Sequence, residues 1–141
     1  MGYRSQVRFV MSKNDYEDLK SKYYSTKRED LSEREDLFYE KHEQDKGWEC
    51  DFIYQERKNG EIVLFGWDWI KWGGEDCRFI ENYIYELGDE DKRNRPCKMV
   101  IMGEDGASEE YIADIVDFDD LYEDYDIIHA DYYISIDEEV K

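Results

Sequence analysis

The chain has 141 residues, with 38 Asp and Glu against 19 Lys and Arg, which gives a formal net charge of −19 at pH 7. This length suits one domain, and a 16% share of aromatic residues supplies apolar surface for a core although 40% of the residues are charged. The charge argues against direct nucleic-acid binding through a broad basic surface, because the chain as a whole repels phosphates.

The first predicted elements are a strand and a helix. Residues 6–11 are β-prone and place apolar side chains on alternate positions. Ser12, followed three residues later by Asp15, resembles an N-terminal capping signal, and the spacing of the next apolar residues predicts a helix over residues 13–24. The highly charged residues 25–46 form either a surface helix or a mobile excursion.

A β-hairpin is the clearest local prediction. Residues 49–57 and 61–72 flank Lys58-Asn59-Gly60, and Asn-Gly supplies the positive φ angles of a tight turn. The second strand is apolar on both faces, which is typical of a strand inside a sheet. One predicted face carries Val63, Phe65, Trp67 and Trp69, and the other carries Ile62, Leu64, Ile70 and Trp72.

A second helix is predicted after the hairpin. Gly73-Gly74 ends the preceding strand, and Asp76 is the expected cap of a helix that runs to Leu87. Gly88 is placed as the residue that follows the helix C-terminus. The predicted buried stripe of this helix consists of Cys77, Ile80, Ile84 and Leu87.

The remaining pattern completes a predicted fold class. Residues 89–96 form a charged loop, residues 97–102 a strand, and two short apolar runs at residues 111–118 and 125–136 add further strands. The order predicts a single α+β domain over the whole chain, with a mostly antiparallel sheet and about two helices. It matches a ferredoxin-like βαββαβ arrangement with a C-terminal β extension.

Acidic residues near the C-terminus are the first candidates for a metal site. Residues 117–124 superficially resemble a calcium loop, but Tyr122 and Ile128 stand where such a loop needs Gly and Glu. A solvated acidic face is the better interpretation, so we expect no metal and no cofactor.

No catalytic pattern is evident in the sequence. Of the two histidines, His42 lies in the charged segment, and His129 among carboxylates is expected to form a structural ion pair rather than act as a base. Cys50, Cys77 and Cys97 have no CxxC spacing, which argues for small buried side chains in a reducing compartment. We therefore expect a protein that is not an enzyme.

Phosphate and membrane sites are also disfavoured. The densest basic cluster, Lys92-Arg93-Asn94-Arg95 with Lys98, is predicted to be a loop that offsets neighbouring acids. Gly103-Glu104-Asp105-Gly106 is predicted to be a turn, because its acids would repel a phosphate. No apolar run approaches the roughly 20 residues that cross a bilayer, and no apolar signal segment opens the chain. We expect a cytoplasmic protein that contacts neither membrane nor nucleic acid.

Protein binding is the function class that remains. Residues 101–141 hold fifteen acidic side chains and one basic side chain, Lys141. Alternate residues of a strand lie roughly 6.6 Å apart on one face, so adjacent acidic strands approach the charge density of duplex DNA. Interleaved tyrosines add rigid contact area. The predicted partner-binding residues are Glu104, Asp105, Glu109, Glu110, Asp117, Asp119, Asp120, Tyr122, Glu123, Asp124, Tyr125 and Asp126. Charge that serves only solubility is the main alternative.

Three short motifs together carry a family resemblance. They are Met1-Gly2-Tyr3-Arg4-Ser5, Trp69-Ile70-Lys71-Trp72 and Gly103-Glu104-Asp105. In this order they resemble a group of small acidic phage and prophage proteins, although Ile101 and Met102 stand where a basic residue is expected before the Gly-Glu-Asp turn. The resemblance implies an accessory protein of an infected bacterial cytoplasm, and it carries over no catalytic residues.

The expected function combines the acidic surface with this resemblance. We expect a DNA-mimic-like inhibitor, of the anti-CRISPR or antirestriction type, that binds a basic host protein such as a defence nuclease or its complex. The alternatives are a small enzyme or ligand-binding protein with a pocket around Trp67, Trp69 and Trp72, and a virion or assembly component. The sequence leaves the oligomeric state open.

Overall fold

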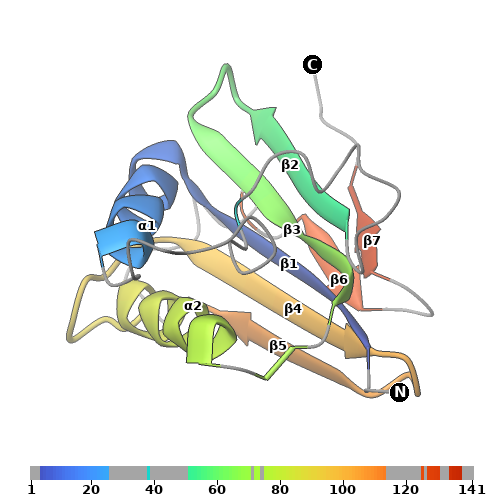
Figure 1. Cartoon of the computed structure of the whole chain (residues 1–141). Coiled ribbons are helices and arrows are strands. Elements are labelled where there is room, and N and C mark those ends of the chain that lie inside the picture. The colour runs from blue at the N-terminus through green and yellow to red at the C-terminus, as the bar shows by residue number, and fades with distance from the viewer. Residues whose placement is uncertain are drawn as a thin grey trace.

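The computed structural model describes residues 4–25, 38, 51–70, 72–73, 75–113, 125, 127–130 and 134–137, without the side chains of residues 51, 69, 75 and 76. Its elements form three layers, with two helices on one face of a five-stranded sheet and a two-stranded sheet on the other (Figure 1). The elements are β1 (Ser5–Ser12), α1 (Lys13–Ser25), β2 (Asp51–Arg57), β3 (Ile62–Ile70), α2 (Glu75–Leu87), β4 (Cys97–Gly103), β5 (Ser108–Ile112), β6 (Ile128–Ala130) and β7 (Ile134–Ile136).

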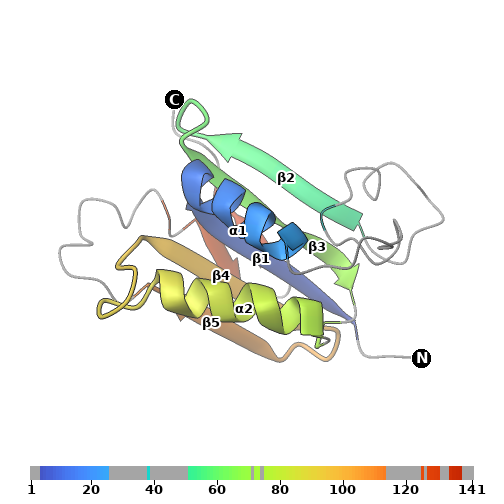
Figure 2. The ribbon, with the colours of Figure 1, turned by 60° about the vertical axis from the view of Figure 1, so that its left-hand side comes forward.

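The strand order confirms the predicted α+β class. The large sheet runs β2-β3-β1-β4-β5, with every neighbouring pair antiparallel. The first four strands therefore follow the ferredoxin-like order, and β5 extends the sheet beyond β4. Both helices cross the same face of this sheet (Figure 2). The predicted hairpin is present as β2 and β3, and β3 lies inside the sheet as its two apolar faces indicate.

A bulge in β3 corrects the predicted face assignment. Ser5 pairs with Ile70 while Val7 pairs with Trp67, so β3 has one residue more than β1 between these pairs. An extra residue reverses which face the following side chains occupy. Ile70 consequently packs in the helix-side core, and Trp72 packs against it. The prediction that these two residues share the face of Ile62 and Leu64 is wrong.

The helix-side core is built largely from aromatic rings. Phe9 stacks on Phe65 with ring centroids 5.1 Å apart, and the fully buried Trp67 lies edge-on to both. Phe38 joins this core with 2% of its surface exposed, and its ring centroid is 5.7 Å from that of Trp67. Residue 38 is thus a described part of the charged segment that lies in the core. The two predicted alternatives for residues 25–46 otherwise lie outside the described residues.

The opposite face of the sheet carries a second core, to which the acidic third contributes. Tyr125, Ile127, Ile128 and Ile134 pack with side chains such as Leu64 on this face. Two side chains of the large sheet also bind this layer. Gln6 Oε1 accepts a hydrogen bond from Ile134 N at 3.1 Å, and Glu110 Oε1 accepts one from Ala130 N at 3.1 Å. The described residues of the last third thus include both exposed acids and a buried structural layer.

The start of α1 is capped as predicted. Ser12 Oγ accepts a hydrogen bond from Asp15 N at 3.1 Å and donates one to Asp15 Oδ2 at 2.7 Å. This reciprocal arrangement satisfies a backbone donor of the first turn. By contrast, α2 begins at Glu75, so the predicted cap residue Asp76 lies inside the helix, and that prediction is wrong.

The end of α2 depends on tertiary contacts. Gly88 follows the last helical residue as predicted, but its φ is not positive. A Cβ at Gly88 would lie 2.7 Å from Tyr111 Oη and 2.9 Å from Cys97 Sγ, so close approach is what requires glycine here. The loop after the helix folds back to cap it. Arg95 N donates to Leu87 O at 2.8 Å, which satisfies one of the terminal carbonyls.

Candidate functional site

The predicted partner-binding residues are only partly covered by the structure. Five of them are described, namely Glu104, Asp105, Glu109, Glu110 and Tyr125. The other seven lie outside the described residues: Asp117, Asp119, Asp120, Tyr122, Glu123, Asp124 and Asp126. The described part of the acidic surface is therefore centred on the β4–β5 hairpin.

The turn of this hairpin presents two exposed acids. Glu104 and Asp105 lie in the connection between β4 and β5, where Gly106 has a φ of 88°. Asp105 Oδ1 accepts a hydrogen bond from Ala107 N at 2.9 Å, and Glu104 Oε1 accepts one from Arg4 N at 3.2 Å. Asp105 thus shapes the turn that the sequence predicts, and Glu104 connects this turn to Arg4, just before β1, while both side chains remain at the surface.

Adjacent acids on β5 point to opposite faces. Glu109 pairs with Ile101, which belongs to the helix-side core, whereas Glu110 pairs with Val100, which belongs to the second core. Both residues are exposed. Glu110 is already engaged with β6 through Ala130 N, so Glu109 is the carboxylate of this pair that faces α2.

Tyr125, one of the predicted partner-binding residues, is mostly buried. Only 6% of its surface is exposed, and its ring packs in the second core with Ile127 and Ile128. Its aromatic area therefore stabilises the layer formed by the acidic third.

An exposed aromatic pair lies between α2 and β5. The rings of Tyr85 and Tyr111 are perpendicular with centroids 5.0 Å apart, and 41% of the Tyr85 surface is exposed. Burial raises the pKa of Tyr85, and the nearby charges of Glu81 and Glu109 raise this pKa further. We call this surface, made of Glu81, Tyr85, Glu109 and Tyr111, the α2–β5 face.

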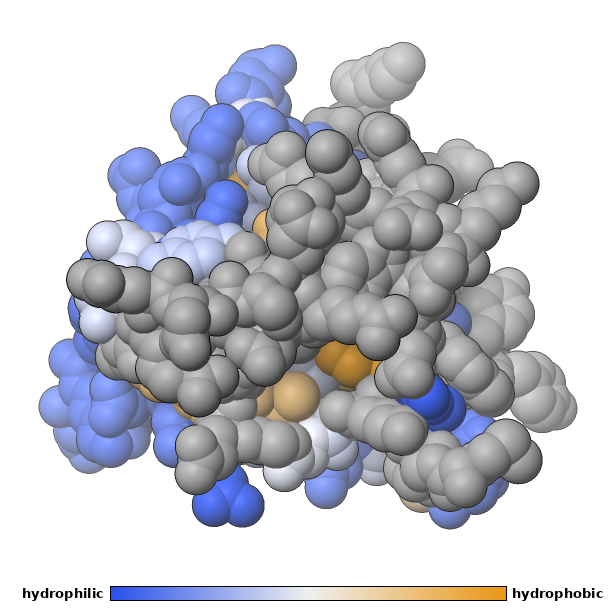
Figure 3. Space-filling model, viewed as in Figure 1, coloured by the Kyte–Doolittle hydropathy of each residue, from blue (hydrophilic) through white to orange (hydrophobic). Residues whose placement is uncertain are grey.

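Sequence reasoning missed the α2 half of this face. Glu81 and Tyr85 precede the acidic third, so the concentration of charge in residues 101–141 does not point to them. A signal was nevertheless present, because the two residues are four apart on a helix and flank the buried stripe at Ile80 and Ile84. On the face of the molecule drawn in Figure 3, the coloured residues are mostly hydrophilic, and hydrophobic residues show only as small patches.

A cavity of about 490 Å³ opens beside the α2–β5 face. It lies where the β3–α2 connection, α2 and the β4–β5 hairpin meet. Trp72 is half-buried on its wall, and its Nε1 donates a hydrogen bond to Glu81 Oε1 at 2.8 Å. The described lining residues are Ser5, Trp72, Gly73, Cys77, Arg78, Glu81, Ile101, Gly103, Ala107, Ser108 and Glu109.

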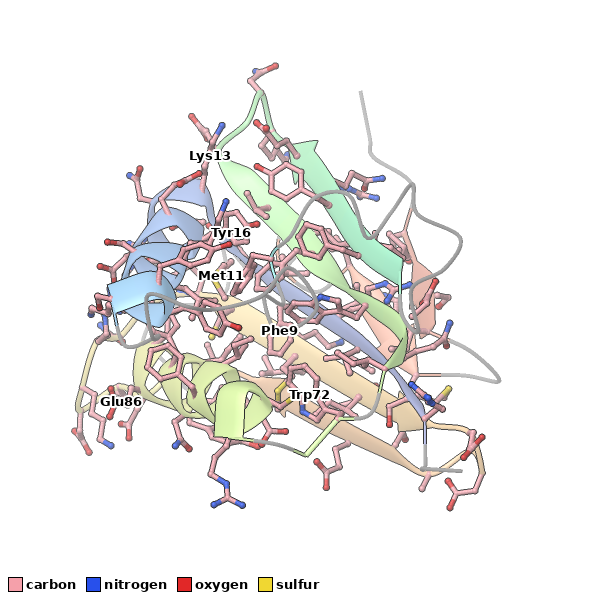
Figure 4. All side chains as sticks on the ribbon, in the orientation of Figure 1. Phe9, Met11, Lys13, Tyr16, Trp72 and Glu86 are labelled. Atoms are coloured by element: carbon pink, nitrogen blue, oxygen red, sulfur yellow. The ribbon has the colours of Figure 1, made fainter. Side chains whose placement is uncertain are left out.

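This cavity differs from the predicted tryptophan pocket. Trp67 is completely buried in the helix-side core with Ile80 and Ile84, so it lines no open pocket. The side chain of Trp69 lies outside the described set. Trp72 alone among these three is seen on the cavity wall, and in Figure 4 it lies next to the core residue Phe9. A pocket exists, and among the tryptophans with described side chains Trp72 is the one that lines it.

The surroundings of Cys97 and His129 indicate structural rather than catalytic roles for these two residues. Burial, followed by the charge of Asp15, raises the pKa of the Cys97 thiol to about 12, so it stays protonated near neutral pH. His129 Nε2 lies 2.9 Å from Asp137 Oδ2, so a carboxylate contacts this histidine as the sequence predicts. Within the described parts of the chain, no group of three or more His, Cys, Asp or Glu side chains could hold a metal ion.

The basic loop after α2 is paired with acids of α1. Arg95 Nε lies 3.0 Å from Asp15 Oδ2, and Arg93 Nη1 lies 3.2 Å from Asp18 Oδ2. Lys98, which follows on β4, is buried with 3% of its surface exposed. Arg93 and Arg95 offset acids, as predicted, but these acids come from a distant segment rather than from sequence neighbours.

Comparisons with protein-family models, with curated proteins and with solved structures gave no match for this chain. Among its described residues, no helix is both long enough and apolar enough to cross a membrane.

Proposed function

We propose that this protein is an acidic binding protein that occupies the nucleic-acid-binding surface of a basic host protein. The proposed target is a defence nuclease or its complex, and the proposed setting is the cytoplasm of a phage-infected bacterium. Inhibition would follow from competition, because the acidic surface would take the place of DNA or RNA phosphates.

The observation that carries the proposal is a group of exposed carboxylates on the β4–β5 hairpin. Among the described residues, Glu104, Glu109 and Glu110 are all exposed and form no ion pair. Some carboxylates elsewhere in the fold do meet cations, as Asp68 meets Arg8 at 2.6 Å and Glu56 meets Lys13 at 3.1 Å. Exposed carboxylates without a cation favour a partner that brings one.

Tyr85 makes the same region suitable for contact. A tyrosine offers apolar area with few rotatable bonds, and aromatic side chains are enriched in the buried centres of protein interfaces. Tyr85 is held edge-on by Tyr111 and flanked by carboxylates, so its ring is already ordered before a partner arrives. Preorganisation of this kind lowers the entropic cost of binding.

The test is capture of partners from a bacterial lysate at low salt, followed by elution with a salt gradient. The captured protein is then measured against the triple variant Glu104→Gln, Glu109→Gln and Glu110→Gln. A control triple, Glu17→Gln, Glu61→Gln and Glu90→Gln, removes the same charge from other exposed positions. We expect the hairpin triple to lower the association rate roughly tenfold at low salt, and the control to lower it much less.

Two results would contradict the proposal. Equal losses for the two triples would show that only total charge matters, as expected if the acidity serves solubility. Binding that is insensitive to salt would show that carboxylates do not carry the recognition, since exposed charges are screened over about 8 Å at physiological ionic strength.

A further inference from the structure

The cavity beside the α2–β5 face is lined by charged, aromatic and apolar groups from several elements. Glu81 comes from α2 and Glu109 from β5, so carboxylates approach the cavity from both elements. Trp72 supplies an aromatic wall, while Ile101 and the buried Cys77 supply apolar surface. Few side chains can satisfy all of these surfaces at once.

The carboxylate of Glu81 is held in place by the aromatic wall. Trp72 Nε1 donates to Glu81 Oε1 at 2.8 Å, which fixes this oxygen and orients the second one. A carboxylate oriented in advance binds a donor at lower entropic cost than a freely rotating one. The indole and the carboxylate therefore act as one preformed unit.

A guanidinium group is the cation that best matches this unit. It is planar and weakly hydrated, it stacks on aromatic rings, and it donates hydrogen bonds to carboxylates in a fixed fork. An ammonium group is more strongly hydrated and has no flat face for the indole. The volume of about 490 Å³ lies within the range of roughly 300–1,000 Å³ found for ligand pockets, so a whole side chain fits.

We propose that this cavity receives an arginine side chain of the partner, between the Trp72 indole and the carboxylates of Glu81 and Glu109. The proposal rests on the proposed function, because it identifies an anchor within the same acidic surface. Anchors of this kind, in which arginine fills a pocket, often dominate the binding energy of an interface.

The local charge supports a cationic occupant. Both Glu81 and Glu109 raise the pKa of Tyr85, which shows that the two carboxylates act on the same small region. Glu86 lies on α2 but does not line the cavity, and Figure 4 shows it at the opposite end of the helix from Trp72. Glu86 therefore provides a matched control position.

Arg78 makes the proposal sharply testable. It is exposed on α2 and contributes to the cavity lining. If the occupant is a cation, Arg78 repels it, and removing this charge should strengthen binding. If the occupant is an anion, Arg78 attracts it, and the same change should weaken binding.

The experiment is a titration of the full chain with N-acetyl-arginine amide, observed by NMR. The readout is the indole N–H resonance of Trp72, which is assigned among the four tryptophans by its loss in Trp72→Phe. We expect a saturable shift, with affinity reduced about tenfold in the double variant Glu81→Gln and Glu109→Gln. We expect little change in Glu86→Gln and tighter binding in Arg78→Gln. Unchanged resonances elsewhere establish that each variant is folded.

Three outcomes would overturn the proposal. They are the absence of a saturable shift, equal affinity for N-acetyl-lysine amide, and binding of N-acetyl-glutamate amide that is lost in Arg78→Gln. The last result would assign the cavity to an anionic ligand instead.

The same variants separate this proposal from the proposed function. If a basic partner is captured in a salt-dependent manner but binds the Glu81→Gln and Glu109→Gln double variant normally, the function stands and the arginine pocket fails. If the arginine amide binds as expected but no basic partner is captured, the pocket stands and the proposed function fails.

Discussion

Arg8 shows how single residues stabilise the irregular part of the sheet. Arg8 is 4% exposed, and its Nη1 donates to Val7 O at 3.0 Å and to Trp67 O at 3.1 Å. Nη2 lies 2.6 Å from Asp68 Oδ1, at the position where β3 bulges. A buried guanidinium requires compensation of its charge, so this carboxylate is what makes burial of Arg8 tolerable.

The two partners of this ion pair should therefore respond differently to substitution. Asp68→Asn leaves a charged side chain buried, and we expect it to lower the free energy of unfolding by about 3 kcal/mol. Arg8→Met leaves Asp68, whose side chain is 35% exposed and can be hydrated, so the loss should be smaller. Urea unfolding at pH 7 measures both values. A larger loss for Arg8→Met would contradict the assignment of Asp68 as the compensating charge.

The buried thiol of Cys97 should lower the free energy of unfolding at alkaline pH. Burial and the nearby charge of Asp15 raise the pKa of its thiol from 9.0 in the unfolded chain to about 12 in the folded protein. Deprotonation therefore favours the unfolded chain between these values, with a limiting loss of about 1.4 kcal/mol per pH unit. Cys97→Ala should reduce this slope in urea unfolding measured from pH 8 to pH 10.5. An unchanged slope would show that the thiol does not contribute.

At the scale of elements, α1 and α2 are joined through a polar cluster rather than through apolar contacts alone. Tyr83 Oη of α2 lies 2.9 Å from Asp15 O and 2.8 Å from Asp18 Oδ2 of α1. Arg93 from the following loop lies over the Tyr83 ring, with 5.0 Å between its Cζ and the ring centroid. The hydrogen bond from Tyr83 is the largest cause that lowers the pKa of Asp18, with Lys22 and Arg93 adding to it.

Removing the Tyr83 hydroxyl should loosen this connection. Tyr83→Phe keeps the ring beneath Arg93 but removes the hydrogen bonds, so we expect a loss of about 1 kcal/mol at pH 7. The pKa of Asp18 should also rise towards its ordinary value of 3.8. A lowered pKa stabilises the fold above the unfolded value and ceases to do so as pH falls through the folded value. The difference between wild type and variant should therefore shrink below pH 4, which NMR titration and thermal unfolding can check.

The elements also show which features of the fold can be predicted from the sequence. The strands β1 to β4, the two helices and their order can be predicted from local periodicity, because each of these elements buries one face or two within a short span. The predicted run at residues 111–118 overlaps β5 only at residues 111–112, and the run at residues 125–136 contains two strands, β6 and β7. The bulge that turns Ile70 towards the helices could not be predicted from local periodicity, since it arises from pairing between β3 and the distant β1. Burial of Phe38 could not be predicted either, because Leu37, Phe38 and Tyr39 are consecutive in a charged segment and their spacing does not single out Phe38. The α2 half of the candidate site depends on β5 lying beside that helix.

At the scale of the whole molecule, the chain carries a net charge of −19 but still buries two apolar clusters. The acidic third adds Ile128, which is completely buried, to the second cluster while it adds carboxylates to the surface. The carboxylates of this segment therefore have opposite effects on folding and on partner binding. Mutual repulsion of the carboxylates favours an expanded chain, whereas a basic partner gains from the same charges.

Salt should consequently have opposite effects on folding and on binding. Raising NaCl from about 10 mM to 1 M shortens the screening length from about 30 Å to about 3 Å, which weakens repulsion within the chain. We expect the Tm to rise with salt, and we expect both glutamine triples to raise the Tm at low salt by similar amounts. Partner affinity should instead fall with salt and distinguish the β4–β5 triple from its control. Differential scanning calorimetry and binding kinetics across one salt series test both expectations. A Tm that depends on which triple is changed would show that the hairpin carboxylates stabilise the fold itself. These carboxylates would then no longer support the proposal of a basic partner.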